Sequence, residues 1–252
     1  MNYLIGDIGN TSLKICKINN KFRIVKTFLF RTKSVYLEKN LKKKINQLAK
    51  NNTCNKILFS SVVPHIYRKI DKIFRKKNFK IFEIKKFDLN KLLKFRVKRY
   101  SQLGSDRIAN AIGAYYKFKT NCIVIDFGTA TTFDVIKKPG MYDGGVITPG
   151  IALSIENLFS STALLPTFKL KKYPTNYGKN TKEALNSGFF WGYQGLINNI
   201  VKKIIKKNNK NFKIILTGGY SNLFKNKIFK QAIIEKDITI QGILKVYRKF
   251  LI

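Results

Sequence analysis

The sequence is poor in residues that form disulfides, bind metals or carry negative charge. Its 252 residues include 3 cysteines and 1 histidine, and Cys16, Cys54 and Cys122 lie far apart without a Cys-x-x-Cys pair. This spacing excludes a disulfide-bonded scaffold and a structural zinc site, and it is typical of a protein in a reducing compartment. Only 13 Asp and Glu accompany 50 Lys and Arg, so the formal net charge is +37.

Long apolar runs are also missing. The longest stretch without Lys, Arg or Asp, residues 144–168, contains Glu156, two prolines and three glycines, whereas a membrane-spanning helix needs about 20 apolar residues. Asp7 interrupts the first apolar stretch and no basic segment precedes it, so we expect no secretory signal. We therefore expect a cytoplasmic protein without a membrane partner. A chain of this length can bury roughly 70–75% of its extended surface, enough for a substantial core.

The positive charge raises the hypothesis of a nucleic-acid partner. However, lysine is spread over every predicted helix and occurs together with abundant asparagine and isoleucine. These three residues have A/T-rich codons, so a bias of the genome accounts for the composition without any ligand. Charge without a recognition motif is weak evidence for binding, and we expect no specific nucleic-acid partner.

Strands and helices alternate along the chain, which predicts an α/β fold. The helix that Pro64 begins has an apolar face made of Ile66, Ile70, Ile73 and Phe74, at helical spacing. The patterns predict strands at residues 3–6, 13–18, 22–29, 57–63, 79–84, 122–127 and 213–216, and further helices over 35–50 and 105–118.

An internal repeat divides the chain. Residues 5–12 (IGDIGNTS) resemble residues 124–131 (VIDFGTAT), and their aspartates, Asp7 and Asp126, are 119 positions apart. In each copy an apolar strand leads into Asp-x-Gly, then a turn rich in hydroxyl residues, then a second alternating strand. The repeat predicts two related α/β halves, residues 1–118 and 119–252, without a flexible linker.

The two Asp-x-Gly turns are candidate phosphate-binding sites. One such turn alone indicates only a hairpin, since Asp and Gly are common in turns. Two equivalent copies favour a ligand, because glycine lets the backbone approach a phosphate and successive turn N–H groups bind anions. The hydroxyls of Thr11, Ser12, Thr129 and Thr131 add donors, and Lys14 adds positive charge. An aspartate at the strand end can hold a hydrated cation. Two such hairpins would bind a nucleoside triphosphate.

Several motifs together resemble a known family. Asp7–Thr11 and Asp126–Thr131 are similar to the two phosphate motifs of the superfamily of actin, acetate kinase and sugar kinases, and Leu216–Gly219 is similar to its adenosine motif. Within this superfamily, Gly104-Ser105-Asp106-Arg107 resembles the Gly-x-Asp-Arg signature of type III pantothenate kinases. Further matches occur, in order, at residues 144–150 and 162–166, and at Thr181 with Gly188, Gly192 and Gly195.

The resemblance implies a fold and an activity. It implies two duplicated actin-like (ribonuclease H-like) domains, each a mixed sheet with flanking helices, with an ATP cleft between them. It also implies ATP-dependent phosphorylation of pantothenate to 4′-phosphopantothenate, the first step of coenzyme A biosynthesis. Mg²⁺ would accompany ATP, a monovalent cation (K⁺ or NH₄⁺) would be required, and the protein would be a homodimer.

The resemblance also implies roles for individual residues. Asp106 would be the general base, Arg107 would hold an anionic group of the substrate or the moving phosphoryl group, and Asp126 would lie at the monovalent-cation site. The residues implied for ATP are Asp7, Ile8, Gly9, Asn10, Thr11, Ser12, Leu13, Lys14 and Thr129. Those implied for the substrate are Tyr100, Gly104, Ser105, Asp106, Arg107 and Thr181.

Three questions stay open at this stage. The family has a substrate-contacting tyrosine seven residues before the signature glycine, where this chain has Val97; either Tyr100 replaces it or the contact is absent. The small residues Ala184, Gly188, Gly192 and Gly195 recur at helical spacing and predict close helix packing. The alternatives to a pantothenate kinase are another small-molecule kinase of the superfamily and a non-catalytic, nucleic-acid-binding relative.

Overall fold

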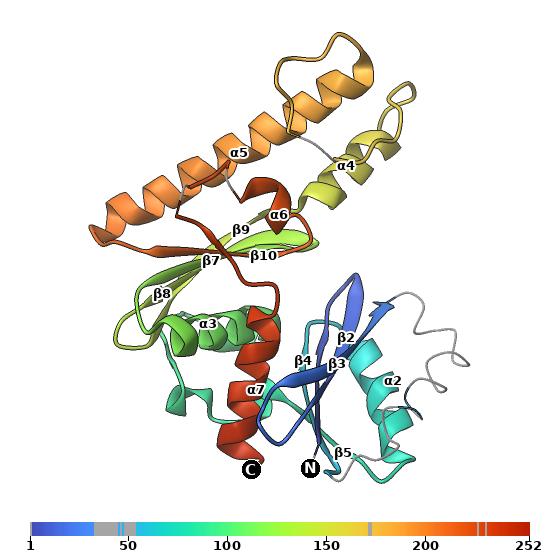
Figure 1. Ribbon diagram of the computed structural model, residues 1–252, viewed down its shortest axis with the longest axis vertical. Coiled ribbons are helices and arrows are strands. Elements are labelled where there is room, and N and C mark those ends of the chain that lie inside the picture. The colour runs from blue at the N-terminus through green and yellow to red at the C-terminus, as the bar shows by residue number, and fades with distance from the viewer. Residues whose placement is uncertain are drawn as a thin grey trace. The chain divides into compact units, whose positions relative to one another are not determined.

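The computed structural model describes residues 2–32, 45, 47, 54–170, 173–225, 227–229 and 231–252. The chain forms two compact units, Met1–Lys117 together with Asp237–Ile252, and Phe118–Lys236 (Figure 1). The first boundary lies next to the predicted one at residue 118, but the C-terminal segment, which the prediction counts in the second half, packs with the first unit. Most of the helix predicted over residues 35–50 lies outside the described residues.

The first unit is built on a mixed sheet of strand order β3-β2-β1-β4-β5. The first three strands pair antiparallel, whereas β1, β4 and β5 run parallel. The bounds are β1 (Tyr3–Ile8), β2 (Ser12–Ile18), β3 (Ile24–Arg31), β4 (Lys56–Ser61) and β5 (Lys80–Glu83). Helix α2 (Pro64–Arg75) buries the four predicted residues, Ile66, Ile70, Ile73 and Phe74, in one core with side chains of β1, β2 and β4.

Helices α3 (Ser105–Phe118) and α7 (Ile238–Phe250) complete this unit, and α7 packs on β1 and β4. The Tyr247 hydroxyl of α7 donates to the carbonyl oxygen of Lys56 at 3.0 Å. The two helices meet at glycines: a Cβ at Gly242 would lie 2.6 Å from the carbonyl carbon of Ala109. The C-terminal segment therefore belongs to the first unit because α7 packs on the sheet of that unit and on α3.

The second unit repeats the first. Its strands follow the order β11-β10-β7-β8-β9, with β7, β8 and β9 antiparallel and β7, β10 and β11 parallel. This order has the topology of β5-β4-β1-β2-β3, so the duplication that the sequence repeat predicts is confirmed. The bounds are β7 (Cys122–Phe127), β8 (Ala130–Lys137), β9 (Met141–Pro149), β10 (Lys213–Gly218) and β11 (Ile233–Ile234).

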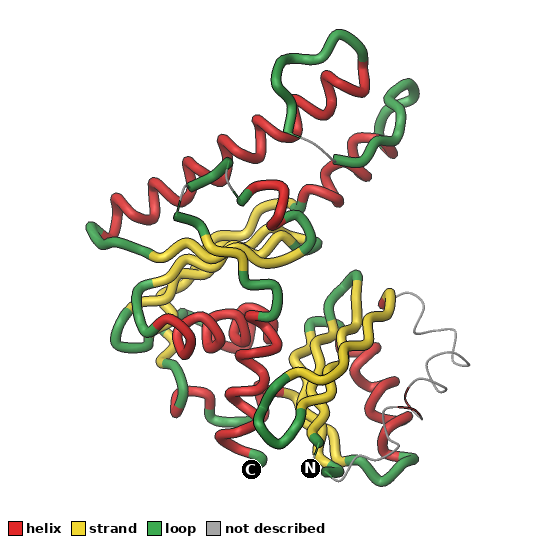
Figure 2. Tube along the Cα trace, viewed as in Figure 1, coloured by secondary structure: helices red, strands yellow, loops and turns green. Residues whose placement is uncertain are grey.

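Helices α4 (Ile151–Ser160), α5 (Thr181–Asn208) and α6 (Ser221–Phe224) flank this second sheet (Figure 2). Phe190, Ile197 and Val201 of α5 are buried in the core of this unit. The predicted close packing of the α5 glycines is wrong: a Cβ at Gly188, Gly192 or Gly195 would have no neighbour within 4 Å in the described part of the chain. The helix contacts its sheet through its large residues instead.

The segment between β5 and α3 holds short elements that lead to the Gly104–Arg107 motif. They are the 3-10 turns Ile84–Lys86, Leu89–Lys91 and Tyr100–Gln102 and the short strand β6 (Lys94–Phe95). Across the residues that the structure describes, no helix is both long and apolar enough to cross a membrane.

Candidate active site

The first predicted phosphate motif is the hairpin between β1 and β2. Its turn is closed by a hydrogen bond from the Gly9 N–H to the carbonyl oxygen of Ser12 at 2.9 Å, and the Thr32 hydroxyl donates to the Gly9 carbonyl oxygen at 2.7 Å. Asn10 and Thr11 are exposed at the tip. The tip therefore offers backbone and side-chain donors to a ligand on a rigid support.

The strands of this hairpin contribute residues of two kinds. Asp7 and Lys14 are directly opposite each other in the β1–β2 ladder, so their side chains lie on the same face of the sheet. Ile8 and Leu13 are fully buried core residues. Only the backbone groups of Ile8 and Leu13 are therefore available to contact ATP.

The second predicted phosphate motif is the hairpin between β7 and β8. Thr217 and Gly218 of β10 lie beside Asp126 and Phe127 of β7. Gly218 has a φ of +83°, and a Cβ there would lie 2.6 Å from Asp126 Oδ1. Only glycine leaves room for the Asp126 carboxylate at this point.

A third motif packs against the same turn. A Cβ at Gly150 would lie 2.6 Å from the carbonyl oxygen of Gly128, and Thr129 is exposed in this turn. The second unit thus brings together the Asp126 hairpin, the end of the 144–150 motif and the Thr217–Gly219 turn. These segments are distant in sequence.

The Gly-x-Asp-Arg motif forms the start of α3. The Ile108 N–H donates to the Gly104 carbonyl oxygen at 3.1 Å, which begins the helix, and a side chain at residue 104 would meet Asp106 Oδ1 at 2.5 Å. Asp106 Oδ1 accepts a hydrogen bond from the backbone N–H of Arg107 at 2.7 Å. Burial raises the pKa of Asp106, and this effect exceeds the opposing effects of that hydrogen bond and of the charges of Arg107 and Lys85.

Glu83 supports this helix start from β5. Its Oε1 accepts a hydrogen bond from the Ser105 hydroxyl at 2.5 Å, and its Oε2 accepts one from the backbone N–H of Lys85 at 2.8 Å. Burial raises the pKa of Glu83, although both hydrogen bonds oppose the shift. Ser105 thus has a structural partner within the chain.

Tyr100 precedes this motif. Its ring lies edge-on to Phe95, with the centroids 5.0 Å apart, and Lys85 Nζ is 6.0 Å from its centroid. Its hydroxyl is buried and has no hydrogen-bond partner among the described residues. Burial, followed by the negative charges of Glu83 and Asp88, raises the pKa of Tyr100 to about 12. The hydroxyl therefore keeps its proton at neutral pH and is a hydrogen-bond donor without an acceptor among the described residues.

Comparison with known proteins identifies the family. The model of the type III pantothenate kinase family matches residues 3–203. The chain is 48% identical over 243 residues to a type III pantothenate kinase of Pelagibacter ubique (strain HTCC1062), covering 96% of this chain and 97% of that protein. It is 34% identical over 247 residues to the one of Desulfosudis oleivorans (strain DSM 6200 / JCM 39069 / Hxd3), covering 95% and 96%. The chain belongs to the type III pantothenate kinase family.

Solved structures support the fold of this family member. A chain described as a Baf family transcriptional activator from Campylobacter jejuni matches with a TM-score of 0.62 and 23% identity, covering 98% of both chains. A 2-dehydro-3-deoxygalactonokinase-like protein from Sinorhizobium meliloti matches with a TM-score of 0.60 and 8% identity, covering 98% of both chains. At these identities the likeness concerns the fold alone.

In this type III pantothenate kinase family member, both units contribute residues to the predicted site. The first unit carries the Asp7–Lys14 hairpin, Tyr100 and the Gly104–Arg107 motif, and the second carries Asp126, Thr129 and Thr181. Thr181 is exposed at the first position of α5, where the side chain of Asn180 caps the helix by accepting from the Glu183 N–H at 3.0 Å.

Sequence reasoning missed two acidic residues. Glu83 hydrogen-bonds Ser105 across 22 positions, and Asp237 pairs with Lys14 across 223 positions. Glu83 is the last residue of β5, and a carboxylate at the end of a short apolar strand is the sequence pattern that could have indicated it. No local pattern marks Asp237, because its partner is set by the packing of α7.

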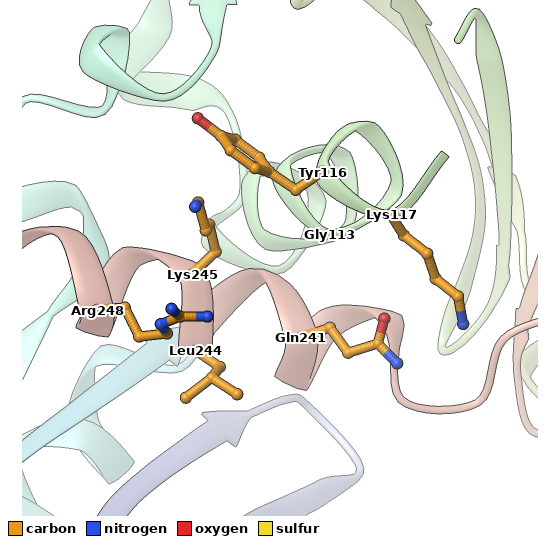
Figure 3. Close-up of a pocket in the computed structure, with 7 residues that line it drawn as sticks. All are labelled: Gly113, Tyr116, Lys117, Gln241, Leu244, Lys245 and Arg248. Carbon is orange, nitrogen blue, oxygen red and sulfur yellow. The ribbon is translucent and has the colours of Figure 1, made fainter. Parts of the chain in front are cut away.

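A pocket of about 370 Å³ lies elsewhere in the first unit, between α3 and α7 (Figure 3). Its lining includes the cations of Lys117, Lys245 and Arg248 but none of the predicted site residues. Lys117 and Arg248 belong to the last turns of their helices, where positive charge offsets the helix dipole. Lys245 Nζ lies 4.2 Å from the ring centroid of Tyr116. The helix dipoles and the Tyr116 ring therefore account for the three positive side chains of this pocket without a bound ligand.

Proposed function

We propose that this chain transfers the γ-phosphoryl group of ATP to the primary hydroxyl of pantothenate, which yields 4′-phosphopantothenate and ADP and opens coenzyme A biosynthesis. The observation that carries the proposal is the half-buried carboxylate of Asp106 at the start of α3, in a chain of the type III pantothenate kinase family. Phosphoryl transfer depends mainly on positioning and on electrostatic stabilisation of the transition state.

Asp106 is the proposed general base. It would accept the proton of the attacking hydroxyl as the bond from oxygen to phosphorus forms. Burial raises the pKa of Asp106, which brings the carboxylate closer to the proton affinity that an efficient base needs near neutral pH. The guanidinium of Arg107 would bind the pantothenate carboxylate or the moving phosphoryl group through its two parallel N–H donors.

The two hairpins are the proposed ATP site. The exposed Asn10–Thr11 tip and the exposed Thr129 offer donors to phosphate oxygens, and Lys14 adds a positive charge. Mg²⁺ bound with ATP would neutralise charge on the phosphate oxygens, and the carboxylate of Asp7 supplies the oxygen ligand that this ion prefers.

Asp126 is the proposed monovalent-cation ligand. A carboxylate oxygen of Asp126 and the carbonyl oxygen of Phe127, both from β7, lie close together beside Gly218 at the end of β10. Such hard oxygen donors fit K⁺ or NH₄⁺. The cation would supply positive charge beside the second phosphate hairpin.

Tyr100 is the proposed replacement for the family tyrosine whose position is occupied by Val97. Its buried hydroxyl lacks a partner within the described part of the chain, and a buried unsatisfied donor is unfavourable until it finds an acceptor. An oxygen atom of pantothenate would be that acceptor. Thr181 of the second unit is proposed as a further substrate contact.

A homodimer is the proposed assembly. Large apolar side chains are exposed on β9, α4 and the segment that follows: Ile147 is 61%, Phe159 43% and Leu164 93% exposed. Apolar groups of this size on one unit support a protein interface. Leu164→Glu should shift the mass measured by light scattering from that of a dimer to that of a monomer.

The deciding experiment measures ADP release from ATP with pantothenate as the acceptor. The wild-type protein should turn over pantothenate, and Asp106→Asn should lose about 10²–10⁴-fold in kcat while still binding ATP. Sugars and acetate serve as control acceptors. If a sugar or acetate replaced pantothenate at equal kcat/KM, the chain would be a different small-molecule kinase of the superfamily.

A further inference from the structure

Lys14 of the first hairpin forms an ion pair with a residue from the far end of the chain. Its Nζ lies 2.6 Å from Oδ1 of Asp237, and the two side chains are 25% and 44% exposed. Lys14 is opposite Asp7 in the β1–β2 ladder, so the pair lies at the strands that carry the first phosphate motif. A ligand in solution can reach both charged groups.

The side chain of Asp237 does not cap the helix that follows it. It occupies the N-cap position of α7, yet its side chain makes no capping hydrogen bond. An aspartate at this position normally accepts from a backbone N–H of the first turn and stabilises the helix. Here its carboxylate accepts from the Lys14 ammonium instead. The ion pair therefore replaces a local stabilising interaction.

The carboxylate is held on a rigid element. Helix α7 packs against β1, and its Thr239 hydroxyl donates to Asn110 Oδ1 of α3 at 2.6 Å. Because Asp237 directly precedes this anchored helix, its position relative to the hairpin is fixed. All three charges also lie near the Cys16 thiol: burial raises the pKa of this thiol, the charge of Lys14 lowers it, and the charges of Asp237 and Asp7 raise it.

We propose that Asp237 is a positioning residue for ATP, which holds the Lys14 ammonium at the phosphate hairpin. An ammonium group has three N–H donors, so one can stay on Asp237 while two bind phosphate oxygens. A lysine fixed in advance loses less conformational freedom when the phosphate binds. The proposal rests on the proposed function, in which this hairpin binds ATP.

A double-mutant cycle tests the proposal. Asp237→Asn should raise the KM for ATP about two- to fivefold, the range that solvent-exposed ion pairs contribute, and leave the KM for pantothenate unchanged. In the background of Lys14→Met the same substitution should have no further effect, because the group that it positions is absent. Asp237→Glu, which retains the carboxylate, should recover part of the loss.

The matched control is Asp71→Asn, which breaks the exposed ion pair between Asp71 and Arg75 on α2 and removes one charge from the same unit. It should leave the KM for ATP unchanged. Equal losses from Asp237→Asn with and without Lys14 would overturn the proposal, and so would a lower KM for ATP, which would mean that Asp237 competes with phosphate for the lysine. Failure of the proposed function is distinguishable, since the wild-type protein would then not phosphorylate pantothenate.

Discussion

The crossing of α3 and α7 makes a quantitative prediction for Gly242→Ala. A Cβ at residue 242 would lie 2.6 Å from the carbonyl carbon and 3.1 Å from the Cα of Ala109. These are backbone atoms of a helix, which cannot rotate away, so the helices must separate. Overpacking costs about 1–3 kcal/mol, and a backbone neighbour places this site near 3. Alanine regains about 1 kcal/mol of helix propensity, which leaves a net loss of about 2 kcal/mol.

Urea and thermal unfolding would measure this loss. For a chain of this size, about 2 kcal/mol corresponds to a Tm lower by roughly 4–8 °C. Gly192→Ala is the matched control, because a Cβ there has no neighbour within 4 Å in the described chain; it should raise the Tm by about 2–4 °C through propensity alone. If Gly242→Ala were as stable as the control variant, the reasoning from direct backbone contact would be refuted.

Three further predictions concern ligands. Tyr100→Phe should raise the KM for pantothenate about 2–10-fold through the loss of one hydrogen bond without lowering the Tm, since the hydroxyl has no partner among the described residues; a lower Tm with unchanged KM would contradict it. Asp126→Ala should weaken both ATP affinity and the preference for K⁺ over Na⁺, and equal wild-type rates in K⁺, Na⁺ and Tris buffers would contradict the cation site. Duplex DNA should bind weakly, and log K should fall with log salt by a slope of about 0.9 for each phosphate contact. Kinase activity should persist at the salt concentration that releases the DNA, and nanomolar, sequence-selective binding would contradict this.

The sequence predicts the parts of the fold that depend on local patterns. The repeat of Asp7 and Asp126 predicts two related halves, and the strands β1–β5 of the first unit and β7–β11 of the second follow the same order. The spacing of Ile66, Ile70 and Ile73 predicts the buried face of α2. These predictions succeed because apolar periodicity reflects burial within a single element.

Long-range packing could not be predicted in this way. No pattern in the sequence of residues 238–250 tells that helix α7 packs on β1 and β4 of the first unit. Gly242 and Gly192 both lie inside helices, but a methyl group at the first would meet backbone and at the second open space. Glu83 and Asp237 acquire their roles from partners 22 and 223 positions away, which only the folded chain brings near.

The burial that would suit Asp106 to its proposed role as a general base also opposes folding. Because its pKa is raised in the folded chain, the folded state holds this proton more tightly than the unfolded state does, and stability falls as the pH rises from the ordinary carboxyl pKa to the raised one. Asp106→Asn has no charge to bury and keeps an oxygen for the Arg107 N–H. We expect this variant to be nearly inactive but to have a higher Tm than the wild type at neutral pH. The difference in Tm should shrink on acidification and disappear below the ordinary pKa, where both side chains are neutral. Thermal unfolding of the two proteins from pH 3 to pH 8 measures it, and a difference that does not change with pH would show that the carboxylate is not destabilised by burial.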